Sequence, residues 1–350
     1  MSYVIGGIQQ LGVGTPDEQG SCEWYARVFG MTTPIFREAA PAPFMTRYTG
    51  GEVQSRSATL AINLQGGSGF EIWQYTSRKT QPAEFEIQTG DLGFLYGKIK
   101  ANDLEGAFAH MKKEGVEILS EKILPLPDGR GCFYLRDPWN NIFQVIEDND
   151  FFQQGKYTTG GPCGAVIGVS DMEKSLKFYQ ELLGYDLIID DETASFEDMA
   201  VLPGGSGKFR RVLLSHSQAP QGPFAPVFGT SYIELVQALD REPVKIFKDR
   251  FWGDAGFIHL CFDILNMPAL QEACNEAGHP FTVDSADSFN MGEAAGHFTY
   301  IEDPDGALIE FVETHKIPLL KKLNWYLDLT KRAGKPLPRW MLKMLKSNKY

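Results

Sequence analysis

Four stretches of the chain repeat one order of apolar and polar positions. Each begins with a short apolar run and continues through a polar residue into a segment with apolar residues at helical spacing, which ends at a glycine. The polar residues are Asp17, Asp103, Asp171 and Asn266, and the glycines are Gly30, Gly115, Gly184 and Gly278. Such residues satisfy the backbone groups that helix ends leave unpaired. Each stretch therefore predicts a strand followed by a helix.

Alternating apolar and polar residues after each helix predict further strands. The second and fourth units end in similar segments, GCFYLRDPWNNIFQVIED and GHFTYIEDPDGALIEFVE, in which Asp-Pro followed by Asn or Gly forms a turn between two strands. The first and third units end in GFEIWQY and SYIELVQ. Corresponding residues of the two halves keep a nearly constant separation, as Glu71 and Glu234 illustrate. The chain thus contains two copies of a pair of related units.

Composition narrows the class of protein. The 350 residues suffice for two domains or four small units, and 43% hydrophobic with 22% charged residues is ordinary for a globular protein. No apolar run approaches the ~20 residues of a membrane span, and the first residues lack a signal pattern. Five cysteines without CxxC spacing argue against disulfides or a cysteine zinc site. We expect a cytoplasmic protein that acts on a small molecule.

The net charge of −12 argues against nucleic acid as a partner. It is unevenly distributed, because ten Lys or Arg residues and only one acid, Asp328, follow residue 315. Apolar residues recur at near-helical spacing between Leu319 and Leu329, and Gly334 and Pro336 interrupt the pattern. We therefore predict a basic helical tail over residues 316–350. It would pack on the acidic domains or on a second copy of the chain, forming a homodimer; a lid or a membrane-surface anchor is less favoured.

At this point a family resemblance emerges. The segments DPDGALIEFVE and MEKSLKFYQELLG resemble the last strand and the first helix of the vicinal oxygen chelate superfamily, which includes glyoxalase I, extradiol dioxygenases, epimerases and bleomycin-resistance proteins. The resemblance covers about residues 5–315. It implies an α+β fold of four βαβββ modules paired into two open U-shaped barrels. We expect glyoxalase-like domains at residues 1–150 (modules 5–76 and 91–148) and 160–315 (modules 162–238 and 255–315), followed by the tail.

The resemblance also implies two metal-ligand positions per module. The positions on the first strands are Gln10, Tyr96, Gly164 and His259, and those on the last strands are Glu71, Gln144, Glu234 and Glu310. If the first module pairs with the fourth, as in fused glyoxalase I proteins, one barrel holds a complete ligand set. Its members are Gln10, Glu71, His259 and Glu310, here called the four-residue site. Pairing in sequence order stays open, with Glu234, His259 and Glu310 as an alternative site.

This ligand set suits an octahedral divalent ion such as Zn, Ni, Co, Mn or Fe. Such an ion stabilises an enediolate while Glu310 or Glu71 moves a proton. The resemblance therefore implies a glyoxalase I-like lyase, isomerase or epimerase that acts on a small carbonyl compound. Glutathione is not the expected substrate, because Gly14, Tyr75 and Ala255 stand where glyoxalase I has residues that bind the glutathione carboxylates.

Two other functions remain open. A non-haem iron dioxygenase of the extradiol or hydroxyphenylpyruvate type would need a histidine where Gly164 stands. A metal-free binding protein of the bleomycin-resistance type would only sequester a ligand in its cleft. Tyr75, His297 and Tyr300 are the candidates for lining a substrate pocket.

Overall fold

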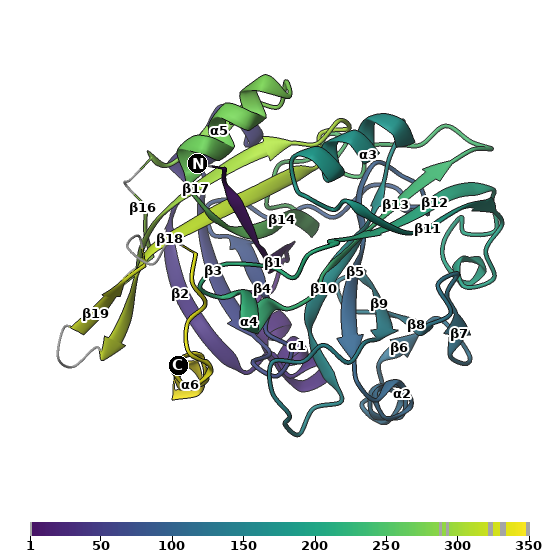
Figure 1. Ribbon diagram of the computed structural model, residues 1–350. Coiled ribbons are helices and arrows are strands. Elements are labelled where there is room, and N and C mark those ends of the chain that lie inside the picture. Colours follow the sequence, from purple (N-terminus) through teal and green to yellow (C-terminus); the bar gives the residue numbers. More distant parts are fainter. Residues whose placement is uncertain (1, 287–288, 292–293, 321–324, 330–333, 348–350) are drawn as a thin grey trace.

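The computed structural model describes residues 2–286, 289–291, 294–320, 325–329 and 334–347, which form two curled sheets with helices around them (Figure 1). The first sheet contains, in spatial order, β15 (Val283–Asp284), β17 (Ala294–Glu302), β18 (Leu308–Leu320), β14 (Gly256–Leu265), β1 (Val4–Gly14), β4 (Gly69–Tyr75), β3 (Ser55–Ile62) and β2 (Thr33–Pro41). Two further strands extend it: β16 (Phe289–Met291) pairs with β17, and β19 (Trp325–Asp328) pairs with β18.

The second sheet is built from the middle of the chain. Its spatial order is β11 (Leu187–Ala194), β12 (Phe209–Ser215), β13 (Tyr232–Ala238), β10 (Thr159–Gly168), β5 (Gly93–Ala101), β9 (Ile142–Glu147), β8 (Gly131–Arg136) and β6 (Glu117–Ile118), and β7 (Leu124–Pro125) pairs with β8. The α-helices are α1 (Glu18–Phe29), α2 (Leu104–Lys113), α3 (Met172–Glu181), α4 (Ala225–Phe228), α5 (Met267–Glu276) and α6 (Arg339–Lys343). Short 3-10 helices are η1 (Pro43–Tyr48), η2 (Met199–Val201) and η6 (Met344–Ser347).

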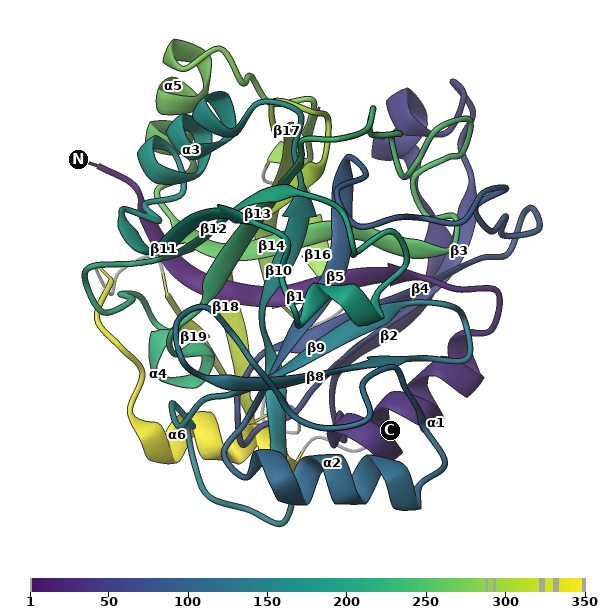
Figure 2. The same ribbon diagram turned by 90° about the vertical axis from the view of Figure 1, so that its right-hand side faces the viewer.

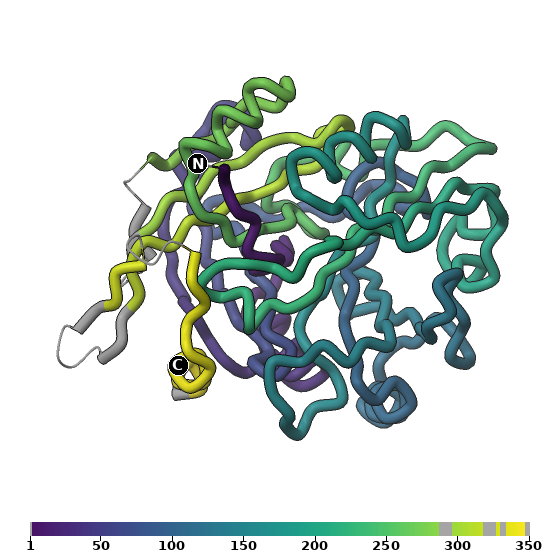
Figure 3. The backbone as a smooth tube through the Cα atoms, in the orientation of Figure 1, coloured from purple at the N-terminus to yellow at the C-terminus, as the bar shows by residue number. Residues whose placement is uncertain are grey.

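The module pairing joins distant parts of the sequence. β1 runs antiparallel to β14, so the first module shares a sheet with the fourth, and β10 runs antiparallel to β5, so the third shares a sheet with the second. The tube in Figure 3 shows purple and yellow-green segments together in one half and blue to teal segments in the other. The pairing of the first module with the fourth is confirmed. Each sheet therefore draws on both sequence ranges, 1–150 and 160–315.

Strand alternation separates a core face from a concave face. Leu11 and Val13 of β1 and Leu260 of β14 are fully buried in a core that both sheets and the helices share. Phe143 of the second sheet packs edge-on against Phe257 of the first, with ring centroids 5.3 Å apart. The intervening residues face the concave side of each sheet, where polar side chains gather.

The predicted helix ends are confirmed. The carboxylates of Asp17, Asp103 and Asp171 accept hydrogen bonds from backbone N–H groups of the first turn, and the four glycines that follow the helices all have positive φ, between 68° and 81°. The fourth helix begins differently, because Asn266 itself has a φ of 71° and its backbone N–H donates to Glu313 (2.6 Å). Figure 2 shows α3 beside α5 on one side of the molecule and α1 beside α2 on the opposite side.

The tail differs from its prediction. The expected helix between Leu319 and Leu329 is wrong where the chain is described: β18 continues through Leu320 and pairs with β19. The free edge of β18 offers backbone hydrogen bonds that outweigh the helical spacing of apolar residues. Leu323 lies outside the described residues. The helical expectation holds for α6.

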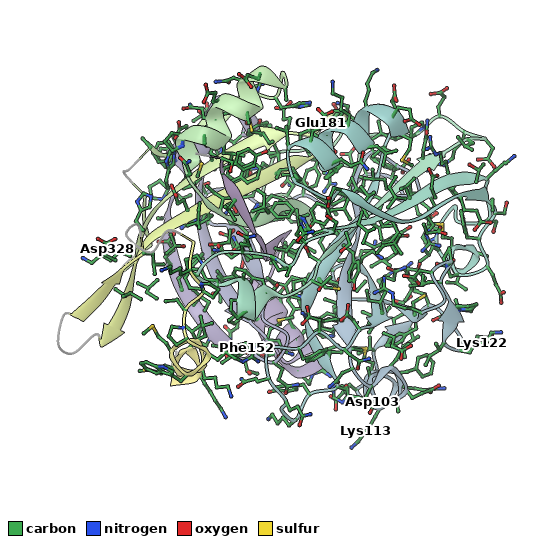
Figure 4. The ribbon with its side chains drawn as sticks, viewed as in Figure 1. Asp103, Lys113, Lys122, Phe152, Glu181 and Asp328 are labelled. Carbon is green, nitrogen blue, oxygen red and sulfur yellow. The ribbon has the colours of Figure 1, made fainter. Side chains whose placement is uncertain are left out.

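The end of the tail packs on its own chain. Leu337 and Leu342 are buried in a cluster with Ile62, and the Arg339 guanidinium lies 4.6 Å from the centroid of the Phe152 ring, which Figure 4 labels beside α6. A homodimer formed through the tail stays a prediction. Within the described residues, no helix is both long and apolar enough to cross a membrane.

Candidate metal site

The four-residue site lies on the concave side of the first sheet. Gln10 comes from β1, Glu71 from β4, His259 from β14 and Glu310 from β18, and these strands are neighbours. Strand register brings them together: Gly12 lies opposite His259 and beside Glu71, and Cys261 lies beside Glu310 and opposite Gln10. One curled sheet thus gathers residues that are up to 300 positions apart in the sequence.

The separations between these side chains fit ligands of a single ion. Gln10 Nε2 lies 3.0 Å from Glu71 Oε2 and 3.3 Å from Glu310 Oε2. His259 Nε2 lies 3.3 Å from Glu71 Oε2 and 3.2 Å from Glu310 Oε2. Neighbouring ligands of an octahedral ion, each about 2.1 Å from it, are about 3.0 Å apart. The site therefore has the dimensions of a divalent-metal centre.

Two buried atoms of the site also fit the ligands of an ion. Among the described residues, Gln10 Oε1 has no hydrogen-bond partner, and His259 Nε2 makes no well-aligned hydrogen bond although it lies close to both carboxylates. Buried polar atoms are nearly always paired in proteins, by protein, water or an ion. Rotating the Gln10 amide by half a turn would place Oε1 beside the two carboxylates. An amide oxygen and an imidazole nitrogen would then face the same point as two carboxylate oxygens.

Room for the imidazole depends on a glycine. A Cβ at Gly12 would lie 2.5 Å from His259 Cε1, which is closer than atoms can approach. On the other side of the ring, Tyr300 Oη lies 3.4 Å from Nδ1. His259 is fully buried, and burial by itself lowers its pKa, but the Glu310 and Glu71 carboxylates reverse this and raise the pKa above its ordinary value. The histidine is therefore held tightly between carboxylates and a tyrosine.

In the second sheet, the positions that correspond to the four-residue site are Tyr96, Gln144, Gly164 and Glu234, and a lysine lies among them. Lys98 occupies the place on β5 that Cys261 occupies on β14, because Lys98 lies beside Gln144 as Cys261 lies beside Glu310. Its ammonium group contacts the Gln144 side-chain oxygen and the Glu234 carboxylate. These two residues match Glu310 and Glu71 of the four-residue site. A tethered cation thus lies where the first sheet could hold an ion.

A network of buried groups completes this second arrangement. Arg211 donates to Glu234 (2.6 Å) and to Asp198 (2.9 Å), and Tyr134 donates to Asp198 (2.9 Å). Burial alone would raise the pKa of Glu234, but Arg211 and Lys98 lower it to about 2. Glu234 is therefore a charged partner of two cations. It does not reach His259 or Glu310, so the alternative site Glu234, His259 and Glu310 is not formed.

The three residues expected to line a substrate pocket, Tyr75, His297 and Tyr300, lie in different places. Tyr300 and Tyr75 are buried in an aromatic cluster beside the four-residue site, with Trp73 packed edge-on against Tyr75 (4.7 Å between ring centroids). His297 is three positions from Tyr300 along β17 and so faces the other side of the strand, where its Nε2 lies 2.6 Å from Asp284. The structure brings Tyr300 into contact with His259, places Tyr75 against Trp252, and leaves His297 away from the site.

Sequence reasoning missed Trp252 and Lys98. Trp252 belongs to the loop between β13 and β14, where no motif marks a position, yet its ring lies parallel to the His259 imidazole with centroids 6.2 Å apart. Lys98 could have been found, because the register that matches Tyr96 with His259 also matches Lys98 with Cys261. A lysine in a buried strand also indicates a buried partner, because lysine is rarely buried without one.

Comparison with known proteins supports this fold. A family model of the Glyoxalase/Bleomycin resistance protein/Dioxygenase superfamily matches residues 7–145 and 163–311. The chain therefore belongs to this superfamily.

Solved structures with the same architecture include a mutant of glyoxalase I from Zea mays, with 16% sequence identity, a TM-score of 0.54 and coverage of 89% of this chain and 94% of that one. Another is a candidate dioxygenase from Bacillus subtilis, with 14% identity, a TM-score of 0.52 and coverage of 89% and 86%. No curated protein sequence matches the chain. At such identities the likeness concerns the fold, and function has to be argued from the site.

Proposed function

We propose that the protein is a metal-dependent enzyme that moves a proton on a small carbonyl compound, as an isomerase, lyase or epimerase of the glyoxalase type that does not use glutathione. The observation that carries the proposal is the convergence of Gln10, Glu71, His259 and Glu310 at the spacing of ligands around one ion. Zn, Ni, Co, Mn and Fe all accept this mixture of oxygen and nitrogen ligands.

When bound there, a divalent ion supplies Lewis acidity, which favours loss of a proton from the carbon beside a carbonyl group. Glu310 is the residue that we assign to the proton itself. Without an ion, burial raises the pKa of its carboxyl group, His259 opposes the shift and Glu71 adds to it. Its position on β18, beside the point where the four side chains meet, is what supports this role. Returning that proton to another carbon or another face gives isomerisation or epimerisation. Glu71 is the second candidate for this role.

The first test is metal content. Elemental analysis of the purified protein should find about one divalent ion per chain, and His259→Ala and Glu310→Ala should each remove most of it, because ligand loss weakens metal binding strongly. Tyr96→Phe is the matched control, since Tyr96 holds the corresponding position in the second sheet and should leave the metal content unchanged. Unchanged metal in the His259 and Glu310 variants would refute the site.

The second test distinguishes proton transfer from a dioxygenase reaction and from metal-free binding. The metal-loaded protein, incubated with hydroxyacetone in deuterated buffer, should exchange C–H for C–D in the NMR spectrum. Glu310→Gln keeps an oxygen ligand but should lose the exchange, because the amide cannot accept the proton. Oxygen uptake without exchange would instead favour the dioxygenase alternative. A protein that binds no metal at all would favour the metal-free binding alternative.

A further inference from the structure

We propose that Trp252 forms a wall of the substrate site, and that the site accepts a carbonyl compound whose remaining part is uncharged and flat, as an aromatic group is. The inference rests on the proposed function of the four-residue site, and it names the class of substrate that this site would take.

The position of Trp252 is the first argument. Its ring lies parallel to the His259 imidazole, at 17° and 6.2 Å between centroids, and it also packs edge-on against Trp73 (4.7 Å) and Tyr300 (6.1 Å). Trp252 and Tyr300 thus both contact the imidazole, and Trp73 packs against Trp252. Met45, Ile258 and Leu308 belong to the same buried cluster. A molecule that reaches the four-residue site must replace part of this packing, so its own surface there has to be apolar.

The loop that carries Trp252 is fixed in place. The backbone N–H of Trp252 donates to the Tyr48 carbonyl (3.1 Å), and the Tyr75 hydroxyl donates to the Trp252 carbonyl. Two residues further on, the fully buried Asp254 carboxylate accepts from the Phe251 N–H (2.8 Å) and from Arg78 (2.7 Å). Because these contacts come from the first module and from the loop itself, the ring has a defined position over the site.

An unpaired donor is the second argument. The indole N–H of Trp252, a residue only 7% exposed, has no hydrogen-bond acceptor among the described residues. A buried donor without an acceptor costs stability, and such groups are retained where a ligand can supply the acceptor. Gln10 Oε1 and His259 Nε2 are likewise buried and poorly satisfied, and the Trp252 ring packs on the His259 imidazole. We assign the indole N–H to an oxygen of the substrate.

Charge is the third argument, because the two arginines described in and beside the Trp252 loop make contacts within the protein. A Cβ at Gly14 would lie 2.0 Å from the Asp254 carbonyl oxygen, so no side chain could extend from this position. Arg78 is paired with Asp254, and Arg250 donates to the backbone oxygens of Ala255 and Ile246. Arg78 is therefore neutralised by Asp254, and Arg250 donates to carbonyl groups of its own loop. This arrangement favours a substrate whose remaining part carries no charge.

The test compares two probes, benzohydroxamate and acetohydroxamate, which chelate a metal through two neighbouring oxygens and differ only in a phenyl or a methyl group. The full-length protein is loaded with Co²⁺ by dialysis, and each probe is titrated while the visible spectrum of the cobalt is recorded. Benzohydroxamate should bind about tenfold more tightly, because the phenyl group buries more apolar surface and packs against aromatic rings. Trp252→Leu should reduce this preference to less than about twofold, and Trp252→Phe should keep most of it.

Trp139→Phe is the matched control, because Trp139 packs against Tyr25 in the central core and not at the site. It should keep the wild-type preference. Equal affinity of the wild-type protein for the two probes, or a preference that survives in Trp252→Leu, would overturn the wall while leaving the metal site intact. Failure to take up Co²⁺ would overturn the proposed function and this inference with it. The wild-type comparison decides the matter even if no Trp252 variant folds.

Discussion

Lys98 and Cys261 occupy equivalent strand positions with opposite consequences. In the second sheet, the Lys98 ammonium binds the two side chains that correspond to Glu310 and Glu71. In the first sheet, Cys261 is too short and uncharged to do so, and the carboxylates face His259 and Gln10 instead. At this strand position the second barrel therefore carries a positive charge, and the first does not.

This reading predicts a large effect of Lys98→Met. Removing one partner of a buried ion pair leaves an uncompensated charge, so the variant should lose about 3–5 kcal/mol in the free energy of unfolding, measured by urea denaturation. Lys122→Met is the control, because this lysine is exposed at the surface (Figure 4) and its replacement should change stability by less than about 0.5 kcal/mol. Equal urea midpoints for the two variants would contradict the assignment. Metal content should be the same in both.

Some residues of the site could be predicted from the sequence and others could not. Gln10, Glu71, His259 and Glu310 were found because each sits in a repeated motif, and the structure brings them together. Trp252 has no counterpart in a motif, and its place depends on how a loop folds over the sheet. The pairing of Lys98 required knowledge of which strands are neighbours, which the spacing of motifs does not give.

At the scale of elements, two helices connect the barrels. Tyr25 of α1, in the first module, donates to Asp137 (2.6 Å) in the β8–β9 turn of the second module. Tyr179 of α3 donates in the same way to Asp303 (3.0 Å) in the β17–β18 turn of the fourth. Modules that follow each other in sequence therefore stay linked through a helix and a turn, although their strands belong to different sheets. The Asp-Pro turns were predicted, but this use of them was not.

The tyrosine contacts should depend on pH. Burial raises the pKa of Asp137 and of Asp303 to about 6, even though hydrogen bonds to each carboxylate lower it. Above pH 6 the aspartates are charged and the hydroxyl groups donate to carboxylates; below pH 6 they are largely protonated and the bonds weaken. Tyr25→Phe or Tyr179→Phe should cost about 1.5–3 kcal/mol in unfolding free energy at pH 7.5 and less at pH 5.

Tyr157→Phe provides the comparison, because the Tyr157 hydroxyl makes no hydrogen bond within the part of the chain that is described. Its effect on the urea midpoint should be small at both pH values. A cost of Tyr25→Phe that stays the same at pH 5 and pH 7.5 would show that the aspartates do not change charge in this range.

Most helix boundaries could be predicted from residues close to them in the sequence. Caps and glycines located the four large helices, because these residues act within one turn of the chain. The tail was harder, since its apolar residues fit a helix by spacing, but a strand edge was already present beside them. Competition from a neighbouring strand cannot be read from the segment itself.

At the scale of the whole molecule, the four-residue site belongs to neither half of the chain. Gln10 and Glu71 lie before residue 150, and His259 and Glu310 lie after residue 160. Each half of the chain contains only two of the four residues, so neither half alone should bind an ion stoichiometrically. The repeat in the sequence suggested both possible pairings, and only the observed neighbours β1 and β14 distinguish them.

A cleavable chain tests this directly. A protease recognition sequence inserted between Gly155 and Lys156, two exposed residues, allows the chain to be cut after folding. The cut protein should keep its metal and elute as one species, because both sheets hold the pieces together. After denaturation and separation, neither piece should bind metal stoichiometrically, as measured by dialysis and elemental analysis. A single piece that keeps the metal would contradict the shared site.

The pairing of the first and fourth modules also affects the order in which the two sheets can form. The strands of the second sheet come from one unbroken stretch, Gly93 to Ala238, whereas β1 must wait for β14, with Val4 beside Leu265. Closing a long stretch of chain is slower than closing a short one. During synthesis, the barrel that contains Lys98 can close while β1, which pairs with β4 of its own module, still lacks β14 on its other side. The second barrel contains the Lys98 ammonium group and can form without an ion. The barrel with the four-residue site, which would bind an ion, is completed last.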